Sequence, residues 1–238
     1  MKRLLCEDYA HLSKIAAEEI ADQLCNKPDS VLGFATGSTP LGMYEELVKM
    51  YNDGTVDFSK ARAFNLDEYY PIKQNHPQSY YTYMVDNFVS KTNLTDFNIP
   101  CGEAGDPHVE AANYETKITA AGGIDLQVLG VGLNGHIAFN EPADVYSLDT
   151  HFVELAESTV QANSRFFSEG EVQPKTAISM GIGTIFKARR IIMLICGRSK
   201  ADIATILLEG KIRPEYPATL LLLHNDFTVL IDREAAGK

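Results

Sequence analysis

Apolar residues along the chain fall into two alternating patterns, one with helical spacing and one in short continuous runs. Helical spacing over residues 9–24 follows Asp8, which can serve as an N-cap. Residues 31–35 form a continuous apolar run, which predicts a buried strand. Thr39 and Pro40 then offer an N-cap and a proline at the first helical position, and they predict a helix to about residue 50.

The same two patterns continue to the end of the chain. Further strands are expected at residues 61–66, 124–131, 152–155, 190–196 and 227–231. Further helices are expected at residues 78–89 and 109–121, after residue 155 to about residue 167, and at residues 200–209. This alternation predicts a three-layer α/β fold with a mostly parallel sheet flanked by helices. No repeat, low-complexity segment or linker divides the sequence, so we expect residues 1–238 to form a single domain.

Charge and cysteine usage narrow the classes of partner and compartment. Lys and Arg total 21 against 32 Asp and Glu, so the net charge is −11, which disfavours nucleic acid but not a small anion in a local pocket. The four cysteines lie far apart, which is typical of free thiols in a reducing compartment. Glu7 and Asp8 interrupt the apolar N-terminus, and the longest apolar runs are far shorter than the ~20 residues of a membrane helix. We therefore expect a soluble, cytoplasmic protein with no nucleic-acid or membrane partner.

The first candidate site follows the strand at residues 31–35. In parallel α/β sheets, ligands bind beyond the carboxyl ends of the strands. Gly37 permits a close backbone approach there, and the hydroxyls of Ser38 and Thr39 and the N–H groups of a helix start can donate to an anion. The alternative is an ordinary strand–turn–helix junction that Thr39 caps. The spacing of a nucleotide-binding P-loop is absent.

Asp67 follows the next predicted strand, where the chain is expected to pass into a loop. Apolar neighbours on the strand could raise the pKa of this carboxylate by partial burial, and it could then act as a general base. The alternative is that Asp67 caps the next turn and that Glu68 is solvated.

The glycine-rich segment after residue 131 presents Asn134, His136 and Glu141. Its Gly-x-Gly-x-x-Gly spacing resembles a dinucleotide-binding turn, but Pro142 leaves no room for the helix that such a turn must open. We interpret it as a tight loop that directs three polar side chains to a pocket, with His136 transferring protons and Glu141 orienting its ring. The alternative is a structural histidine.

Arg165 and Lys200 are candidate cations for a phosphate, although either could be a surface ion pair. The spacing of His136, Glu141 and His151 does not indicate a metal site, and no serine-hydrolase elbow occurs. An anion cradle, one or two cations and two separate proton-transfer groups together suit the isomerisation of a sugar phosphate.

Six strings in order resemble the glucosamine-6-phosphate deaminase (isomerase) family: FATGSTP, FNLDEY, HPQSYYTYM, GVGLNGHIAFNEP, NSRFF and GRSK. The resemblance runs from about residue 31 to residue 231. The related 6-phosphogluconolactonases share the scaffold, but they normally continue the Gly-His loop with a Ser-Leu-Phe-Pro-like segment rather than Phe139-Asn140-Glu141-Pro142. The resemblance therefore implies the modified Rossmann-like fold of this superfamily.

The resemblance also implies an activity: glucosamine 6-phosphate and water become fructose 6-phosphate and ammonium, without a metal or organic cofactor. It implies that Asp67 moves the C2 proton toward C1 and that His136 opens the sugar ring with the help of Asn134 and Glu141. It places the phosphate at Gly37, Ser38, Thr39, Arg165 and Lys200.

Two departures from the family pattern affect these expectations. Asn134 stands where many members have aspartate, and an amide can hold His136 but cannot stabilise its charged form as a carboxylate would. Allosterically activated hexameric members carry basic residues where this chain has His151 and Val153, and they have a longer C-terminus. We therefore expect a monomer or small homo-oligomer that N-acetylglucosamine 6-phosphate does not activate.

Two other functions are alternatives to the deaminase. One is a 6-phosphogluconolactonase-like esterase or another sugar-phosphate isomerase, which would release no ammonium. The other is a non-catalytic sugar-phosphate sensor, which would be expected to have lost Asp67 or His136, although both are present.

Overall fold

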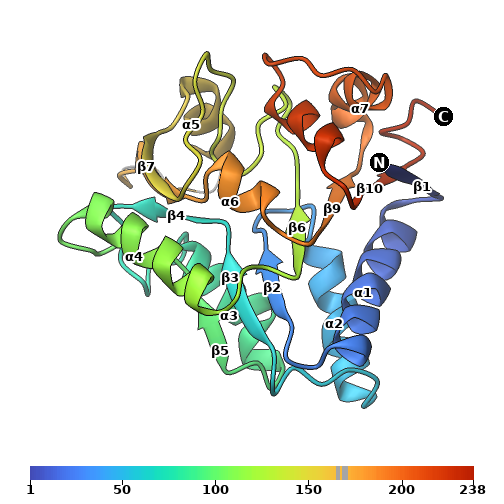
Figure 1. Ribbon diagram of the computed structural model, residues 1–238, viewed down its shortest axis with the longest axis horizontal. Coiled ribbons are helices and arrows are strands. Elements are labelled where there is room, and N and C mark those ends of the chain that lie inside the picture. The colour runs from blue at the N-terminus through green and yellow to red at the C-terminus, as the bar shows by residue number, and fades with distance from the viewer. Residues whose placement is uncertain (165–166, 168–170) are drawn as a thin grey trace.

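The largest feature of the computed structural model is a parallel β-sheet. The structure describes residues 1–164, 167 and 171–238, and within them this sheet has seven strands, all parallel (Figure 1). Their order across the sheet is β1 (Lys2–Cys6), β10 (Phe227–Asp232), β9 (Arg190–Ile195), β6 (Leu126–Leu129), β2 (Val31–Phe34), β3 (Arg62–Asn65) and β5 (Asp96–Asn98). Because all seven strands are parallel, their carboxyl ends share one edge of the sheet. The expected mostly parallel sheet is confirmed.

A second, smaller sheet carries the segment that follows β3. Its strands are antiparallel and lie in the order β4 (Asp67–Tyr70), β8 (Thr176–Ser179) and β7 (His151–Glu154). The expectation that the chain enters a loop at Asp67 is wrong, because Leu66 separates two strands of different sheets. The N–H of Met180 donates to the carbonyl of Leu66 at 2.8 Å, so the end of β8 is fixed at this crossing point.

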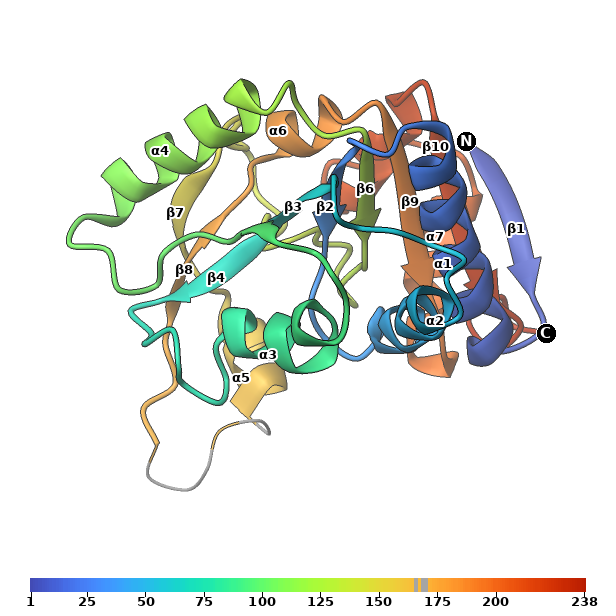
Figure 2. The same ribbon diagram turned by 90° about the horizontal axis from the view of Figure 1, so that it is seen from below.

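Helices cover both faces of the large sheet, as the apolar strands require. One face packs against α1 (Tyr9–Asn26), α2 (Leu41–Asn52) and α3 (Tyr80–Asn87). The other packs against α4 (Pro107–Ala120), α6 (Ile182–Phe186), α7 (Ala201–Leu208) and the 3-10 helix Pro217–Leu223 (Figure 2). Alternate residues of one strand serve the two cores, with Leu32 on the first face and Val31 on the second. The three layers are therefore those expected.

The helix starts test two of the predicted N-caps. The Asp8 carboxylate accepts the N–H of His11 at 2.8 Å, which confirms this residue as the cap of α1. The prediction for Thr39 is wrong: α2 begins at Leu41, Pro40 takes the N-cap position, and no side chain caps this helix start. Within the described residues, no helix is long and apolar enough to span a membrane.

Candidate active site

Asp67 is a buried carboxylate at the start of β4. It is 6% exposed, and burial together with the charge of Glu68 raises its pKa to about 8. Among the described residues no side chain or N–H group donates to its carboxylate, while the Asn65 amide donates to its backbone carbonyl at 3.2 Å. Glu68 is only 2% exposed, so the alternative of a capping Asp67 beside a solvated Glu68 is wrong. A carboxyl group with this pKa can accept a proton from a weak carbon acid near neutral pH.

The loop after β6 brings Asn134, His136 and Glu141 together. The Asn134 amide donates to a Glu141 carboxylate oxygen at 2.6 Å, and His136 Nδ1 lies 3.2 Å from the same oxygen. Asn134 Oδ1 also accepts the backbone N–H of His136 at 3.2 Å. The three polar side chains that the sequence placed in one loop therefore form one connected cluster.

Two glycines allow this loop to close on the imidazole ring. A Cβ on Gly132 would lie 2.3 Å from His136 Cε1, closer than atoms can approach, so the ring requires a glycine there. Gly135 has φ +81°, which favours glycine, and its N–H closes the turn by donating to the Gly132 carbonyl at 3.0 Å. The glycine-rich sequence thus serves histidine placement and not a dinucleotide.

Glu141 is held as a carboxylate by several donors. Burial alone would raise its pKa, but hydrogen bonds from His136, Thr159 and Asn134 and the charge of His136 lower it to about 2. Thr159 of α5 (Glu157–Ser164) donates its hydroxyl to the second Glu141 oxygen. Sequence reasoning missed Thr159, because only the tertiary structure brings it to Glu141. A carboxylate in this state can orient the histidine ring at every working pH.

The small sheet connects this loop to Asp67. Ser179 of β8 pairs with Asp67, and its hydroxyl accepts the backbone N–H of Phe139 at 3.1 Å. The Asn140 amide donates to the Met180 carbonyl at 2.8 Å, one residue further along. The structure therefore joins Asp67 and the His136 loop through a strand that the sequence did not predict.

The loop after β2 exposes Gly37 and Ser38 to solvent, and hydrogen bonds to its backbone carbonyls hold it in place. Gly37 has φ +99° and its carbonyl accepts the Tyr83 hydroxyl at 2.7 Å, while the Ser38 carbonyl accepts the Tyr9 hydroxyl at 3.0 Å. Thr39 Oγ1 lies 3.9 Å from the thiol of Cys196, which follows β9. The hydroxyls and N–H groups expected to bind an anion thus precede α2 at the carboxyl edge of the sheet.

Lys200 follows β9, which lies beside β6 in the sheet, and its ammonium group donates to the Val131 carbonyl at 2.7 Å. This contact ties Lys200 to the start of the His136 loop, and its charge also acts on Cys196, whose thiol lies beside Thr39 of the Gly37 loop. The other predicted cation, Arg165, lies outside the described residues.

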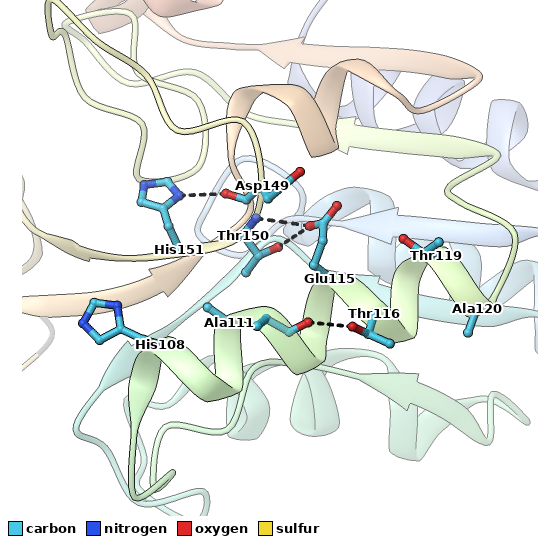
Figure 3. Close-up of a pocket in the computed structure, with 10 residues that line it drawn as sticks. His108, Ala111, Glu115, Thr116, Thr119, Ala120, Asp149, Thr150 and His151 are labelled. Carbon is cyan, nitrogen blue, oxygen red and sulfur yellow. Dashed lines mark hydrogen bonds between the residues drawn. The ribbon is translucent and has the colours of Figure 1, made fainter.

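A groove of about 610 Å³ lies elsewhere, between α4 and the start of β7 (Figure 3). Its polar lining includes His108, Glu115, Asp149 and His151. Burial lowers the pKa of His151, so this side chain is neutral at pH 7. No predicted site residue lines the groove. In the part of the chain that the structure describes, His, Cys, Asp and Glu side chains form no group of three that could hold a metal ion.

Comparisons with known proteins agree with the fold and extend over the whole chain. The model of the family described as glucosamine-6-phosphate isomerases/6-phosphogluconolactonase matches residues 7–230. Relatives from Clostridium botulinum (strain Hall) and Halothermothrix orenii, both described as glucosamine-6-phosphate deaminase, are 50% and 51% identical; the matches cover all of this chain and 98% and 99% of the relatives.

Two solved structures share this fold but differ in how similar their sequences are to this chain. A structure described as a monomeric glucosamine-6-phosphate deaminase matches with a TM-score of 0.96 at 45% identity, over 100% of this chain and 99% of that one. A 6-phosphogluconolactonase from Thermotoga maritima matches with a TM-score of 0.74 at 19% identity, over 97% and 98% of the two chains. The second likeness concerns the fold alone.

Proposed function

Because the chain belongs to the family of glucosamine-6-phosphate isomerases and 6-phosphogluconolactonases, we propose that it is a glucosamine-6-phosphate deaminase. The enzyme converts glucosamine 6-phosphate and water to fructose 6-phosphate and ammonium, a step in amino-sugar breakdown. The observation that carries this function is the identity of half the residues, over the full length, to relatives described as deaminases. The phosphogluconolactonase from Thermotoga maritima shares only the fold at 19% identity.

In this proposal Asp67 is the base that shifts a proton along the substrate. It takes the proton from C2 of the open-chain sugar, the C–H electron pair forms the C1–C2 double bond of an enolamine, and the aldehyde π electrons move to O1, which takes a proton from water. The proton on Asp67 then goes to C1 and the nitrogen loses a proton to solvent, which leaves an imine at C2. Water adds to the imine carbon and ammonia leaves, so that the ketone of fructose 6-phosphate remains. The raised pKa of Asp67 supports this role, since a base with a pKa near the working pH transfers protons most efficiently.

His136 opens the sugar ring by moving a proton between the anomeric hydroxyl and the ring oxygen. Glu141 orients the imidazole from its Nδ1 side, and Asn134 fixes both the Glu141 carboxylate and the His136 backbone. Nδ1 faces Glu141, so we assign proton transfer to the other ring nitrogen, Nε2.

The substrate phosphate binds at the loop after β2. N–H groups and hydroxyls of Gly37, Ser38 and Thr39 donate to its oxygens, and Arg165 and Lys200 neutralise its charge. The contact of Lys200 with Val131, at the start of the His136 loop, and its charge beside Cys196 support its part in this assignment.

The enzyme is a monomer whose 238 residues act as a single catalytic domain, and N-acetylglucosamine 6-phosphate does not activate it. A structural relative described as monomeric supports the first statement. His151 and Val153 support the second, because they stand where activated members of the family carry basic residues. The described cysteines are free thiols, which fits the cytoplasm as the proposed location.

The direct test is ammonium release from glucosamine 6-phosphate by the purified protein, with and without EDTA, alongside an assay of fructose 6-phosphate. We expect equal amounts of both products and no effect of the chelator. Hydrolysis of 6-phosphogluconolactone without ammonium release would instead indicate the esterase. Binding of the sugar phosphate without turnover would indicate a sensor.

A further inference from the structure

Glu68 is a buried carboxylate that the proposed reaction does not use. It follows Asp67 on β4 and accepts three backbone N–H groups, those of Tyr69, Tyr80 and Tyr81, each at 2.9 Å. Tyr80 and Tyr81 are the first two residues of α3. One side chain of the base-bearing strand thus binds the start of a helix from a different part of the chain.

The start of α3 depends on this contact. A helix leaves its first N–H groups without intrahelical partners. Ser79 caps the third of them by accepting the N–H of Thr82 at 3.0 Å, and Glu68 takes the first two. The first turn of α3 contains no acidic residue, so Glu68 supplies the negative charge that a helix start favours.

The same helix contacts both loops of the proposed site. The Tyr83 hydroxyl donates to the Gly37 carbonyl at 2.7 Å, in the loop assigned to the phosphate. The Tyr80 ring stacks on Phe139 of the His136 loop, with centroids 6.2 Å apart and planes at 15°. In Figure 2, α3 lies beside β4, from which Glu68 reaches it.

We propose that Glu68 is a positioning residue: it fixes the first turn of α3 to β4 and so holds the Gly37 loop and the His136 loop in place relative to Asp67. This inference rests on the proposed function for its kinetic consequences, although its geometry can be tested without activity. Glu68 also acts on Asp67 through charge, since it is the one described carboxylate whose charge raises the pKa of Asp67.

The other titratable groups that face Asp67 are tyrosines. They are Tyr69 of β4, Tyr80 of α3 and Tyr114 of α4, and burial raises the pKa of each above its ordinary value of 10. They are therefore neutral where Asp67 loses its proton. Burial raises the pKa of Glu68 to about 7, so Glu68 is mostly charged at that point.

The first experiment compares Glu68→Gln with Glu115→Gln. Glu115 of α4 is a matched control, because it also binds another segment through backbone and hydroxyl donors, at Thr150 and Thr184, but it does not adjoin Asp67. We expect Glu68→Gln to move the acid limb of kcat/KM down by about one pH unit, since a like charge beside Asp67 is removed. Glu115→Gln should leave the limb in place. Equal limbs in both variants would overturn the electrostatic part of the proposal.

Hydrogen exchange tests the positioning without substrate. We expect Glu68→Gln to speed amide exchange at residues 80–82, because an NH2 group replaces one carboxylate oxygen in glutamine and cannot accept a backbone N–H. Exchange should also speed up at the hydrogen-bonded amides of Phe139 and Asn140, since Tyr80 stacks on Phe139. Faster exchange confined to residues 80–82 would overturn the proposed link to the His136 loop. This outcome is independent of the proposed function, which fails only if the wild-type protein releases no ammonium.

A second variant removes a single hydroxyl from the first turn of the helix. Tyr83→Phe should raise KM roughly 3- to 10-fold with little change in kcat, as expected for the loss of one hydrogen bond to the Gly37 loop. Tyr81→Phe is the matched control on the same helix, since no described group pairs with its hydroxyl and its ring packs against Phe97. An unchanged KM in Tyr83→Phe would contradict the proposal.

Discussion

At the scale of single residues, the acidic groups of the proposed site have opposite proton affinities. Burial and the neighbouring Glu68 raise the pKa of Asp67 to about 8, while three donors and the charge of His136 lower that of Glu141 to about 2, against the effect of burial. Two carboxylates in one site can thus perform different tasks: one exchanges a proton with substrate, and the other stays charged and orients a histidine.

The loss of activity at low pH, the acid limb of the pH profile, should follow the protonation of Asp67. The base must be deprotonated, so kcat/KM should fall about tenfold per pH unit below about pH 8. A pH series of initial rates, with activity checked after return to pH 8, measures this limb. A limb near pH 4 would mean that Asp67 titrates like an ordinary aspartate and that its burial does not act as described.

Replacement of Asp67 by asparagine should abolish turnover and increase stability. Activity should fall far more than substrate binding, because the base acts in the transition state. The folded-state pKa is above the ordinary 3.8, so burial of the charge costs stability increasingly as pH rises from about 4 to about 8.

We expect Asp67→Asn to increase the free energy of unfolding by roughly 2 kcal/mol at pH 9. This gain is smaller than the free energy that corresponds to the whole pKa shift of Asp67, because asparagine buries an unpaired amide. That gain raises Tm by roughly 4–8 °C for a chain of this size. At pH 4 the difference should nearly vanish. Thermal unfolding at both pH values is the measurement, and full turnover in this variant would disprove the assigned base.

Lys200→Ala should weaken substrate binding more than turnover. Loss of one charged donor to the phosphate should raise KM roughly 10- to 100-fold. Arg198→Ala is the control, because Arg198 lies in the same turn but is exposed. If both variants have the wild-type KM, Lys200 does not bind the phosphate.

At the scale of elements, the loop after β6 depends on close backbone packing. Gly132→Ala should displace the His136 ring, because its Cβ would lie 2.3 Å from Cε1. We expect kcat to fall about 100-fold or more, the effect of displacing a catalytic group by about 1 Å. Gly130→Ala is a matched control in the same loop, since its Cβ would meet no atom within 4 Å. Equal activity of the two variants would show that the ring tolerates the shift.

At the scale of the whole molecule, two sheets meet at Leu66 and hold the site between them. The parallel sheet supplies the Gly37 loop, the His136 loop and Lys200, and the antiparallel sheet supplies Asp67. None of these residues lines the groove beside His151, whose acidic side chains Glu115 and Asp149 both pair with Lys187. His151 and Val153 stand where activated members of the family carry basic residues, so we expect no activation by an anionic sugar phosphate.

Rate curves should therefore be hyperbolic in glucosamine 6-phosphate, with or without N-acetylglucosamine 6-phosphate. Initial-rate measurements with and without this compound, together with sedimentation of the protein, test both the lack of activation and the monomer. A sigmoidal curve that becomes hyperbolic on its addition would overturn both expectations.

Features that depend on neighbouring residues could be predicted from the amino-acid sequence. Strand 31–35 and helix 9–24 were predictable because their apolar spacing is local, and Asp8 because a cap binds an N–H three residues away. The cluster of Asn134, His136 and Glu141 was predictable because all three lie within eight residues, and Gly132 and Gly135 allow the chain to turn tightly there.

Contacts between residues far apart in the chain became known from the folded structure. Strand β4 leaves the parallel sheet at Leu66, and Ser179 and Thr159 reach the site from segments that carry no motif. The charge of Glu68 was compatible with a solvated side chain, yet this side chain binds the start of a helix twelve residues further along the chain. Such contacts depend on how whole helices and strands pack together, and this packing cannot be read from the composition of either contacting segment alone.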